Sequence, residues 1–117
     1  SFDALCLEKN AIQYYEKAIE IGLPDEEMQG AYLGLGSTFR TLGQYEKSKN
    51  IFEEGLEKFP ENRGMKVFYA MTLYNLGKHP KAMEILLLCL AETSSDENIN
   101  KYKKAIKFYA DKLDKIW

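Results

Sequence analysis

The chain has 117 residues, of which 45% are hydrophobic and 29% are charged, a composition typical of one small globular domain. Its 16 Lys and Arg against 18 Asp and Glu give a formal net charge of −2. Because binding to a phosphate backbone requires an accumulated positive field, this balance argues against a general nucleic-acid binder. The longest apolar run, 85–91, is far shorter than the roughly 18 residues of a membrane span. We therefore expect neither nucleic acid nor membrane as a partner.

The two cysteines, Cys6 and Cys89, lie far apart in apolar segments and form no Cys-x-x-Cys pair. This pattern is typical of reduced core thiols in a cytoplasmic protein, with a disulfide or a thiol redox role as the alternatives. We therefore expect a cytoplasmic protein with no metal site and no cofactor. No signal peptide is visible, but the chain begins at Ser1 instead of a methionine and is compatible with a fragment of a longer protein.

Every segment between the chain breakers has the periodicity of an amphipathic helix, and none alternates as a strand does. The expected helices span residues 3–21, 25–42, 44–58, 61–76, 79–92 and 96–116. Connections this short join antiparallel neighbours. The sequence therefore predicts an all-α protein of about six helices.

The second expected helix contains the glycine-rich stretch 33–43, LGLGSTFRTLG, which has to be weighed as a phosphate-binding loop. The motif G-x-G-x-x-G would need a glycine at Phe39, the motif G-x-x-x-x-G-K-[ST] would need a following lysine, and no strand precedes the stretch. We therefore expect no nucleotide site here. Gly43 and Gly77 are expected instead to end their helices in a left-handed conformation.

A shift of 34 residues aligns the chain with itself. The shift pairs Gly30 with Gly64, Thr38 with Thr72, Leu42 with Leu76, Gly43 with Gly77, Lys47 with Lys81, Ile51 with Ile85 and Leu56 with Leu90. An internal period of about 20 to 50 residues indicates stacked supersecondary units.

The residue types at this period resemble the tetratricopeptide repeat (TPR), whose pattern is W-x2-L-G-x2-Y, then A-x3-F, then P. The first copy follows the pattern with Tyr32, Leu35, Gly36, Phe39, Ser48, Phe52 and Pro60. The second copy follows it with Tyr69, Ala70, Leu73, Ala82 and Leu86, and departs from it at Lys66 and Ser94. The resemblance implies a single domain, 1–117, that forms a right-handed α-solenoid. Its parts are a helix like the second half of a repeat (1–28), two repeats (29–62 and 63–95) and a C-terminal capping helix (96–117).

In the TPR family the first helix of each pair lines a concave groove, so the resemblance implies a surface that binds a peptide or a helix. The candidate contacts are Leu33, Ser37, Arg40, Thr41, Val67, Phe68, Met71, Tyr74 and Asn75. Phe68, Met71 and Tyr74 would form an adaptable apolar patch unless the last helix covers them. In the first repeat, Gly30 and Gly34 are expected to leave room on the concave face. The lysine–asparagine clamp of some members is absent, because Leu33 and Ser37 occupy its positions.

The fifth expected helix is apolar nearly all round, because Leu87 and Leu88 stand where the first repeat has Glu53 and Glu54. Such a helix requires burial on more than one side, by the last helix or by a second copy of the chain. Leu87, Leu88 and Trp117 are therefore candidates for self-association.

The last expected helix carries Lys101, Lys104 and Lys107 on one face. These lysines either bind an acidic peptide segment at the end of the groove or form a solvated face. His79 is the single histidine, and nothing in the sequence completes a catalytic triad around it, so we expect a packing role at the helix turn.

We predict a non-catalytic, cytoplasmic protein–protein interaction module that binds a peptide or helix segment in its groove. The alternative is a homodimerisation module whose apolar surfaces pair with a second copy. A sensor domain that binds a small molecule or a signalling peptide is a third hypothesis.

Overall fold

The computed structural model describes the backbone of residues 2–117 and the side chains from Lys9 onwards, so Cys6 lies outside the described side chains. The elements are α1 (Phe2–Ile21), α2 (Asp25–Thr41), α3 (Tyr45–Lys58), α4 (Arg63–Asn75), α5 (His79–Thr93), α6 (Glu97–Lys101) and α7 (Lys103–Tyr109). Within these residues every regular element is a helix, which confirms the predicted all-α class. No helix in residues 2–117 combines the length and the hydropathy needed to cross a bilayer.

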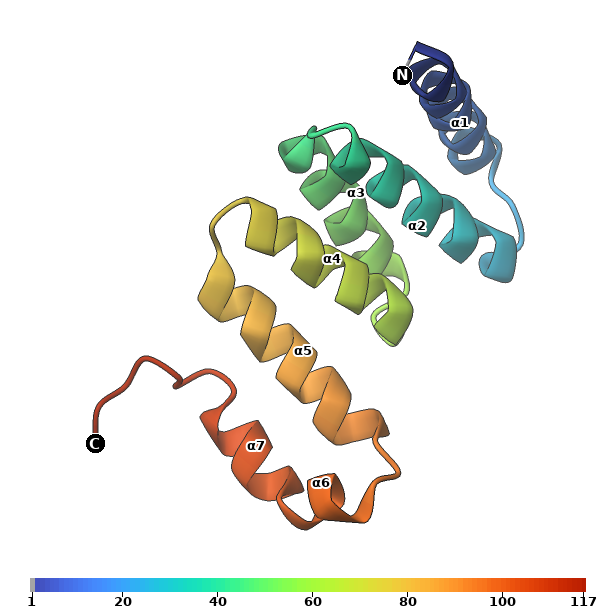
Figure 1. Cartoon of the computed structure of the whole chain (residues 1–117). Helices are drawn as coiled ribbons and strands as arrows, with labels where there is room; N and C mark the ends of the chain where they lie inside the picture. Colours follow the sequence, from blue (N-terminus) through green and yellow to red (C-terminus); the bar gives the residue numbers. More distant parts are fainter. Residues whose placement is uncertain (1) are drawn as a thin grey trace.

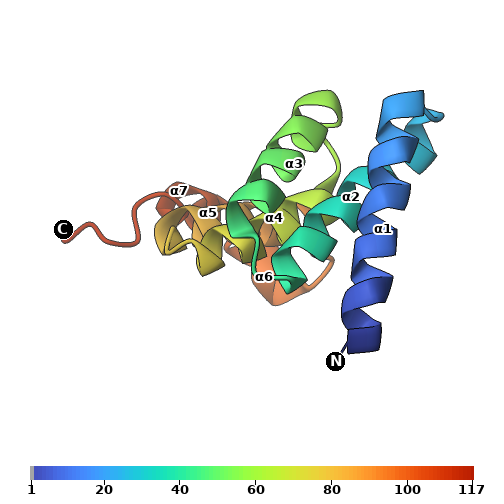
Figure 2. The same cartoon turned by 90° about the horizontal axis from the view of Figure 1, so that it is seen from above.

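The helices pack mainly against their neighbours in sequence. Helix α1 packs on α2, α2 on α3, α3 on α4 and α4 on α5, while α2 also contacts α4. Helices α2 and α4 lie side by side with α3 behind them (Figure 1), and the view from above agrees (Figure 2). The chain ends lie at opposite ends of an elongated body of 49 × 30 × 23 Å. This is a stack of helix pairs, α2 with α3 and α4 with α5.

Helices α2 and α4 both end at a left-handed glycine. The φ angle is 77° at Gly43 and 78° at Gly77, a region that glycine adopts without the steric cost of a Cβ atom. The N–H of Gln44 donates to the carbonyl of Phe39 at 2.9 Å, which closes the end of α2. Gly77 ends α4 in the same way, so both predicted helix stops are confirmed.

Small residues allow α2, α3 and α4 to approach closely at one buried point. A Cβ atom on Gly36 would lie 2.5 Å from Cζ of Phe52, whose side chain is fully buried. Ser48 is also fully buried, and its hydroxyl donates to the carbonyl of Gly36 at 2.7 Å and shares a 2.8 Å hydrogen bond with the hydroxyl of Thr72. A single serine thus joins three helices and leaves none of these polar atoms without a partner.

The C-terminal segment differs from the prediction. The sequence predicts one helix over 96–116, whereas the structure has two short helices that meet at Tyr102, followed by turns after Tyr109. Asp96 caps α6, because its carboxylate accepts two backbone N–H groups of that helix at 2.9 and 3.1 Å. The apolar side chains that one long helix would align in a stripe remain largely exposed. The expected helix is therefore wrong as a single element, because no packing stabilises it over its whole length.

We expect Gly36→Ala to lower the free energy of unfolding by about 2 kcal/mol, because the added methyl group would overlap the buried ring of Phe52. Gly30→Ala is the matched control in the same helix, since a Cβ atom there would meet nothing within 4 Å. That change should raise stability by about 0.5–1 kcal/mol through helix propensity. Urea denaturation followed by circular dichroism measures both values, and equal stability of the two variants would contradict the packing assigned to Gly36.

Candidate functional site

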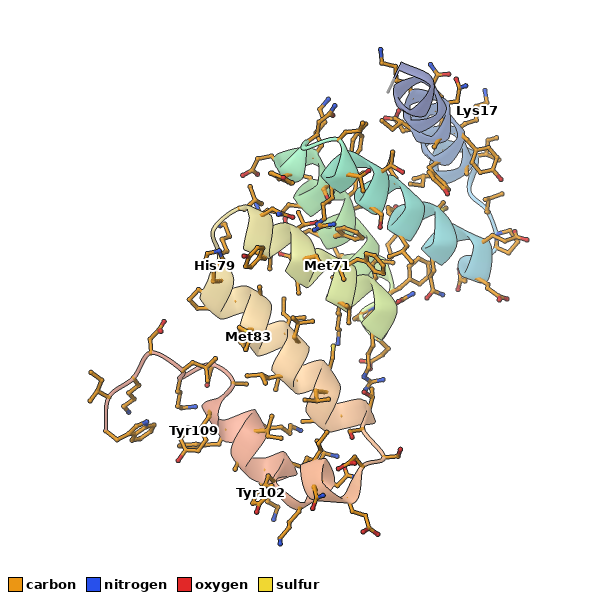
Figure 3. All side chains as sticks on the ribbon, viewed as in Figure 1. Lys17, Met71, His79, Met83, Tyr102 and Tyr109 are labelled. Carbon is orange, nitrogen blue, oxygen red and sulfur yellow. The ribbon has the colours of Figure 1, made fainter. Side chains whose placement is uncertain are left out.

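A largely apolar pocket lies between α4 and α5, and we call it the α4–α5 pocket. Its volume is about 290 Å³, and it is lined by Arg40, Ala70, Met71, Tyr74, His79, Ala82, Met83 and Leu86. Met71 comes from α4, and His79 and Met83 come from α5 (Figure 3). The pocket therefore joins the first and second helices of one pair, with a single residue from α2 at its edge.

Helical spacing explains why these side chains share one opening. His79, Met83 and Leu86 follow one another at four and three residues along α5, so they lie on one face of that helix. Ala70 and Ala82 form a buried base where α4 and α5 meet, at 1% and 4% exposure. The larger side chains around them stand in solvent, with Tyr74 62% exposed and Met83 44% exposed. The result is an apolar depression that can receive a bulky apolar side chain.

Polar contacts fix the rim of the pocket. The Nε atom of Arg40 donates to Oδ1 of Asn75 at 2.7 Å, which ties the end of α2 to the end of α4. The Nε2 atom of His79 lies 3.1 Å from the carbonyl oxygen of Tyr74, and the two rings lie 4.8 Å apart. Among the described residues Arg40 has no carboxylate partner within ion-pair distance. Its positive charge is therefore available at the rim.

The structure brings together some of the predicted groove residues and separates others. Arg40, Met71 and Tyr74 meet in the pocket, and Asn75 positions Arg40. Leu33 and Phe68 are half-buried against the core cluster around Tyr32 and Phe52, while Ser37 and Val67 are half-buried and Thr41 is exposed. Only part of the predicted set is thus open to a partner.

The prediction that Gly34 leaves room on the concave face is wrong. A Cβ atom at this position would overlap the ring of Tyr15 in α1. The missing side chain makes room for the N-terminal helix, so α1 covers this part of α2.

The three predicted lysines do not form one continuous face. Lys101 ends α6, whereas Lys104 and Lys107 lie on α7, because the helix is interrupted at Tyr102. All three are exposed. Lys101 Nζ lies 5.8 Å from the centroid of the Tyr102 ring, a cation–π distance.

The residues predicted for self-association, Leu87, Leu88 and Trp117, differ in their exposure to solvent. Leu87 and Leu88 are half-buried, and Leu88 lines a pocket of about 240 Å³ beside Lys66 and Tyr69. The exposed leucines of α5 are Leu86 and Leu90 instead, at 37% and 42%. Trp117 is 69% exposed, and its ring centroid lies 5.8 Å from that of Phe108.

The α5 wall of the pocket is absent from the predicted site. At the 34-residue spacing Leu86 corresponds to Phe52, a core residue, so the repeat pattern predicts a buried position for Leu86. Phe52 is 0% exposed because another helix pair follows α3, whereas in the described residues the short helices α6 and α7 follow α5 and Leu86 stays 37% exposed. The sequence feature that could have indicated the exposure of Leu86 is the absence of a standard third repeat after residue 95.

Comparison with known proteins agrees with this architecture. Residues 1–113 match a family model described as "Tetratrico peptide repeat". Superkiller protein 3 of Saccharomyces cerevisiae is 23% identical over 91 residues, which cover 78% of this chain and 6% of that protein. An uncharacterized protein of Aquifex aeolicus is 31% identical over 83 residues, which cover 71% of this chain and 10% of that protein.

A TPR repeat-containing protein of Methanocaldococcus jannaschii is 35% identical over 69 residues, which cover 59% of this chain and 12% of that protein. The chain therefore spans between 6% and 12% of the length of these three relatives.

We expect the thiol of Cys89 to react slowly with disulfide reagents. It is a free, buried cysteine, and burial raises the pKa of the Cys89 thiol, so less of the reactive thiolate is present at a given pH. A Cys6→Ser variant isolates this group. Its reaction with Ellman's reagent at pH 8 should be at least about tenfold slower in buffer than in 8 M urea. Equal rates in the two solutions would contradict the burial of Cys89.

Proposed function

The chain belongs to the tetratricopeptide repeat family, and we propose that it is a non-catalytic module that binds an apolar segment of a protein partner. Members of this family generally mediate protein–protein interaction. The α4–α5 pocket is the observation that carries the proposal, because it combines an apolar base with large, solvent-exposed side chains around it. Methionines at the rim adapt to side chains of different shapes.

The distribution of exposed apolar side chains supports this surface. Among the described residues, the large hydrophobic side chains that are exposed on α4, α5 and the C-terminal segment are Met71, Tyr74, Met83, Leu86, Leu90, Tyr102, Phe108, Tyr109, Leu113, Ile116 and Trp117. From Lys9 to Lys58, the part of α1 to α3 with described side chains, this class contains Tyr14 and Ile21, both on α1. Concentration of exposed apolar surface in one region is typical of an interface.

The proposed contacts extend from the pocket along the groove. They comprise Arg40, Met71 and Tyr74 at the pocket and Leu33, Ser37, Thr41, Val67, Phe68 and Asn75 in the rest of the groove. Lys101, Lys104 and Lys107 would favour acidic neighbours of the bound segment. We also propose a reducing compartment such as the cytoplasm, which the free thiol of Cys89 supports.

A homodimer is the second candidate function. The observation in its favour is the exposed strip of Leu86 and Leu90 on α5, close in sequence to the half-buried Leu87 and Leu88. Trp117 adds an exposed aromatic ring at the end of the chain. A second copy that covers these residues would remove the largest part of the exposed apolar surface of α5.

We expect Met71→Ala and Tyr74→Ala to reduce the capture of protein partners from a native lysate, because each removes apolar area at the rim of the pocket. Tyr14→Ala is the matched control, since Tyr14 is similarly exposed, at 69% against 62% for Tyr74, but lies on α1. Quantitative mass spectrometry of the captured proteins measures the effect, with circular dichroism as the check on folding. Capture that is equal for Tyr74→Ala, Met71→Ala and Tyr14→Ala would reject binding at the pocket.

The homodimer predicts a solution mass of twice 13.5 kDa, the mass of one chain. Leu90→Glu should then restore the monomer, because it places a charge in the exposed strip. Light scattering coupled to gel filtration measures both. A monomer at millimolar concentration would exclude the homodimer while leaving the peptide-binding module in place.

A further inference from the structure

The first helix pair provides an internal template for what the α4–α5 pocket receives. In that pair, α4 lies against both α2 and α3. Phe52 of α3 is 0% exposed beneath this packing, whereas Leu86, its equivalent in α5 at the 34-residue spacing, is 37% exposed. The corresponding position of the second pair is therefore left without a covering helix.

Helix α7 does not occupy this position. It packs against α5, but the residues after it, 110–115, line a pocket with Pro80, Lys81 and Glu84. Glu84 and the buried Ala91 are seven residues apart on α5 and lie on one face, which is separate from the face of Met83 and Leu86. The C-terminal segment thus covers a different side of α5.

The sequence of α5 explains this placement. On α3 the residues that correspond to Leu87 and Ala91 are Glu53 and Glu57, and both are exposed to solvent. Replacement of the two carboxylates by apolar residues gives α5 an additional face that gains free energy on burial. Residues 110–115 lie on the Glu84 side of α5, and no residue of α7 lines the α4–α5 pocket.

We infer that the α4–α5 pocket, with Leu90 beside it, is the binding site for a single amphipathic helix of an acidic protein partner. This inference rests on the proposed function and specifies the chemistry of the partner. The donated helix would take the place beside α4 and α5 that α4 itself takes beside α2 and α3. The binding mode is that of a helix whose apolar face enters a groove.

The side of α4 that faces the preceding pair defines the spacing of the donated helix. It presents Met65, Phe68 and Tyr69, at positions i, i+3 and i+4. The sulfur of Met65 lies where a Cβ atom of Gly55 would project, Phe68 packs on the core cluster, and the rings of Tyr69 and Phe52 are 6.4 Å apart. A partner helix with three large apolar residues at the same spacing matches the depression.

Charge selects the acidic helix. The basic side chains that line the pocket are Arg40 and His79, and no carboxylate lines it. Residues 63–117 carry ten Lys and Arg against six Asp and Glu, and residues 1–62 carry six against twelve. All lining residues of the pocket except Arg40 thus belong to the positively charged half of a chain with a net charge of −2. A carboxylate of the partner would pair with Arg40, which Asn75 already holds in place.

Two synthetic peptides test the inference. Both have 17 residues and leucines at positions i, i+3, i+4 and i+7 on an alanine background, and they differ in carrying four glutamates or four lysines on the opposite face. Fluorescence anisotropy with the full chain measures the two affinities. We expect the acidic peptide to bind at least about tenfold more tightly than the basic one at 50 mM salt, and the preference to fall in 500 mM salt.

Three variants locate the bound peptide. Leu86→Ala should weaken binding of the acidic peptide about tenfold, and Arg40→Gln should reduce the preference for it over the basic peptide. Ile21→Ala, an exposed apolar residue on α1, should leave both affinities unchanged. Circular dichroism checks that each variant keeps the helix content of the parent.

Equal affinities for the two peptides, or an affinity that Leu86→Ala leaves unchanged, would overturn the inference. Binding to phosphatidylserine vesicles but to neither peptide would also overturn it and assign the surface to a membrane. Neither result decides the proposed function, because partner capture that depends on Tyr74 is measured separately. Loss of that dependence, with intact peptide binding, would instead count against the capture of natural partners at this site.

Discussion

The contact between Gly36 and Phe52 determines how closely α2 and α3 can pack, and the position of the later helices follows from it. The bare backbone at Gly36 accepts the phenylalanine ring, and the neighbouring Ser48 connects α3 to both α2 and α4 through its hydroxyl. Since Thr72 holds α4 at the same point, the packing of α2 and α3 sets the orientation of the second pair, α4 and α5. The groove residues of α2 and α4 are thereby placed side by side.

A second constraint is that each helix pair exposes an apolar face that another helix must cover. On α3 this apolar face is covered, because α4 buries Phe52. On α5 the corresponding face is covered only in part. There Leu87 and Ala91 create a competing apolar face, and residues 110–115 lie on the Glu84 side of α5, next to that face. The α4–α5 pocket thus arises because two apolar faces of one helix have a single short segment to cover them, which links the packing of the fold to its binding surface.

Local signals allowed much of this fold to be predicted from the sequence. Gly43 and Gly77 end helices because of their own backbone freedom, and Gly36 and Ser48 are small because a neighbour at fixed spacing requires it. The α5 wall of the pocket and the break at Tyr102 could not be predicted in the same way. Both depend on which of several apolar faces is covered, a competition between distant segments that periodicity in one helix does not resolve.

The ring of Tyr15 on Gly34 has a consequence for the length of the groove. Helix α1 packs on α2, at one end of a stack in which the inner helices each have neighbours on two sides. In such a one-dimensional array the terminal unit separates at a lower free energy than the whole unfolds. Release of α1 would uncover the backbone of α2 at Gly34 and extend the recognition surface towards the N-terminus. The length of the exposed groove therefore depends on the equilibrium between packed and released α1.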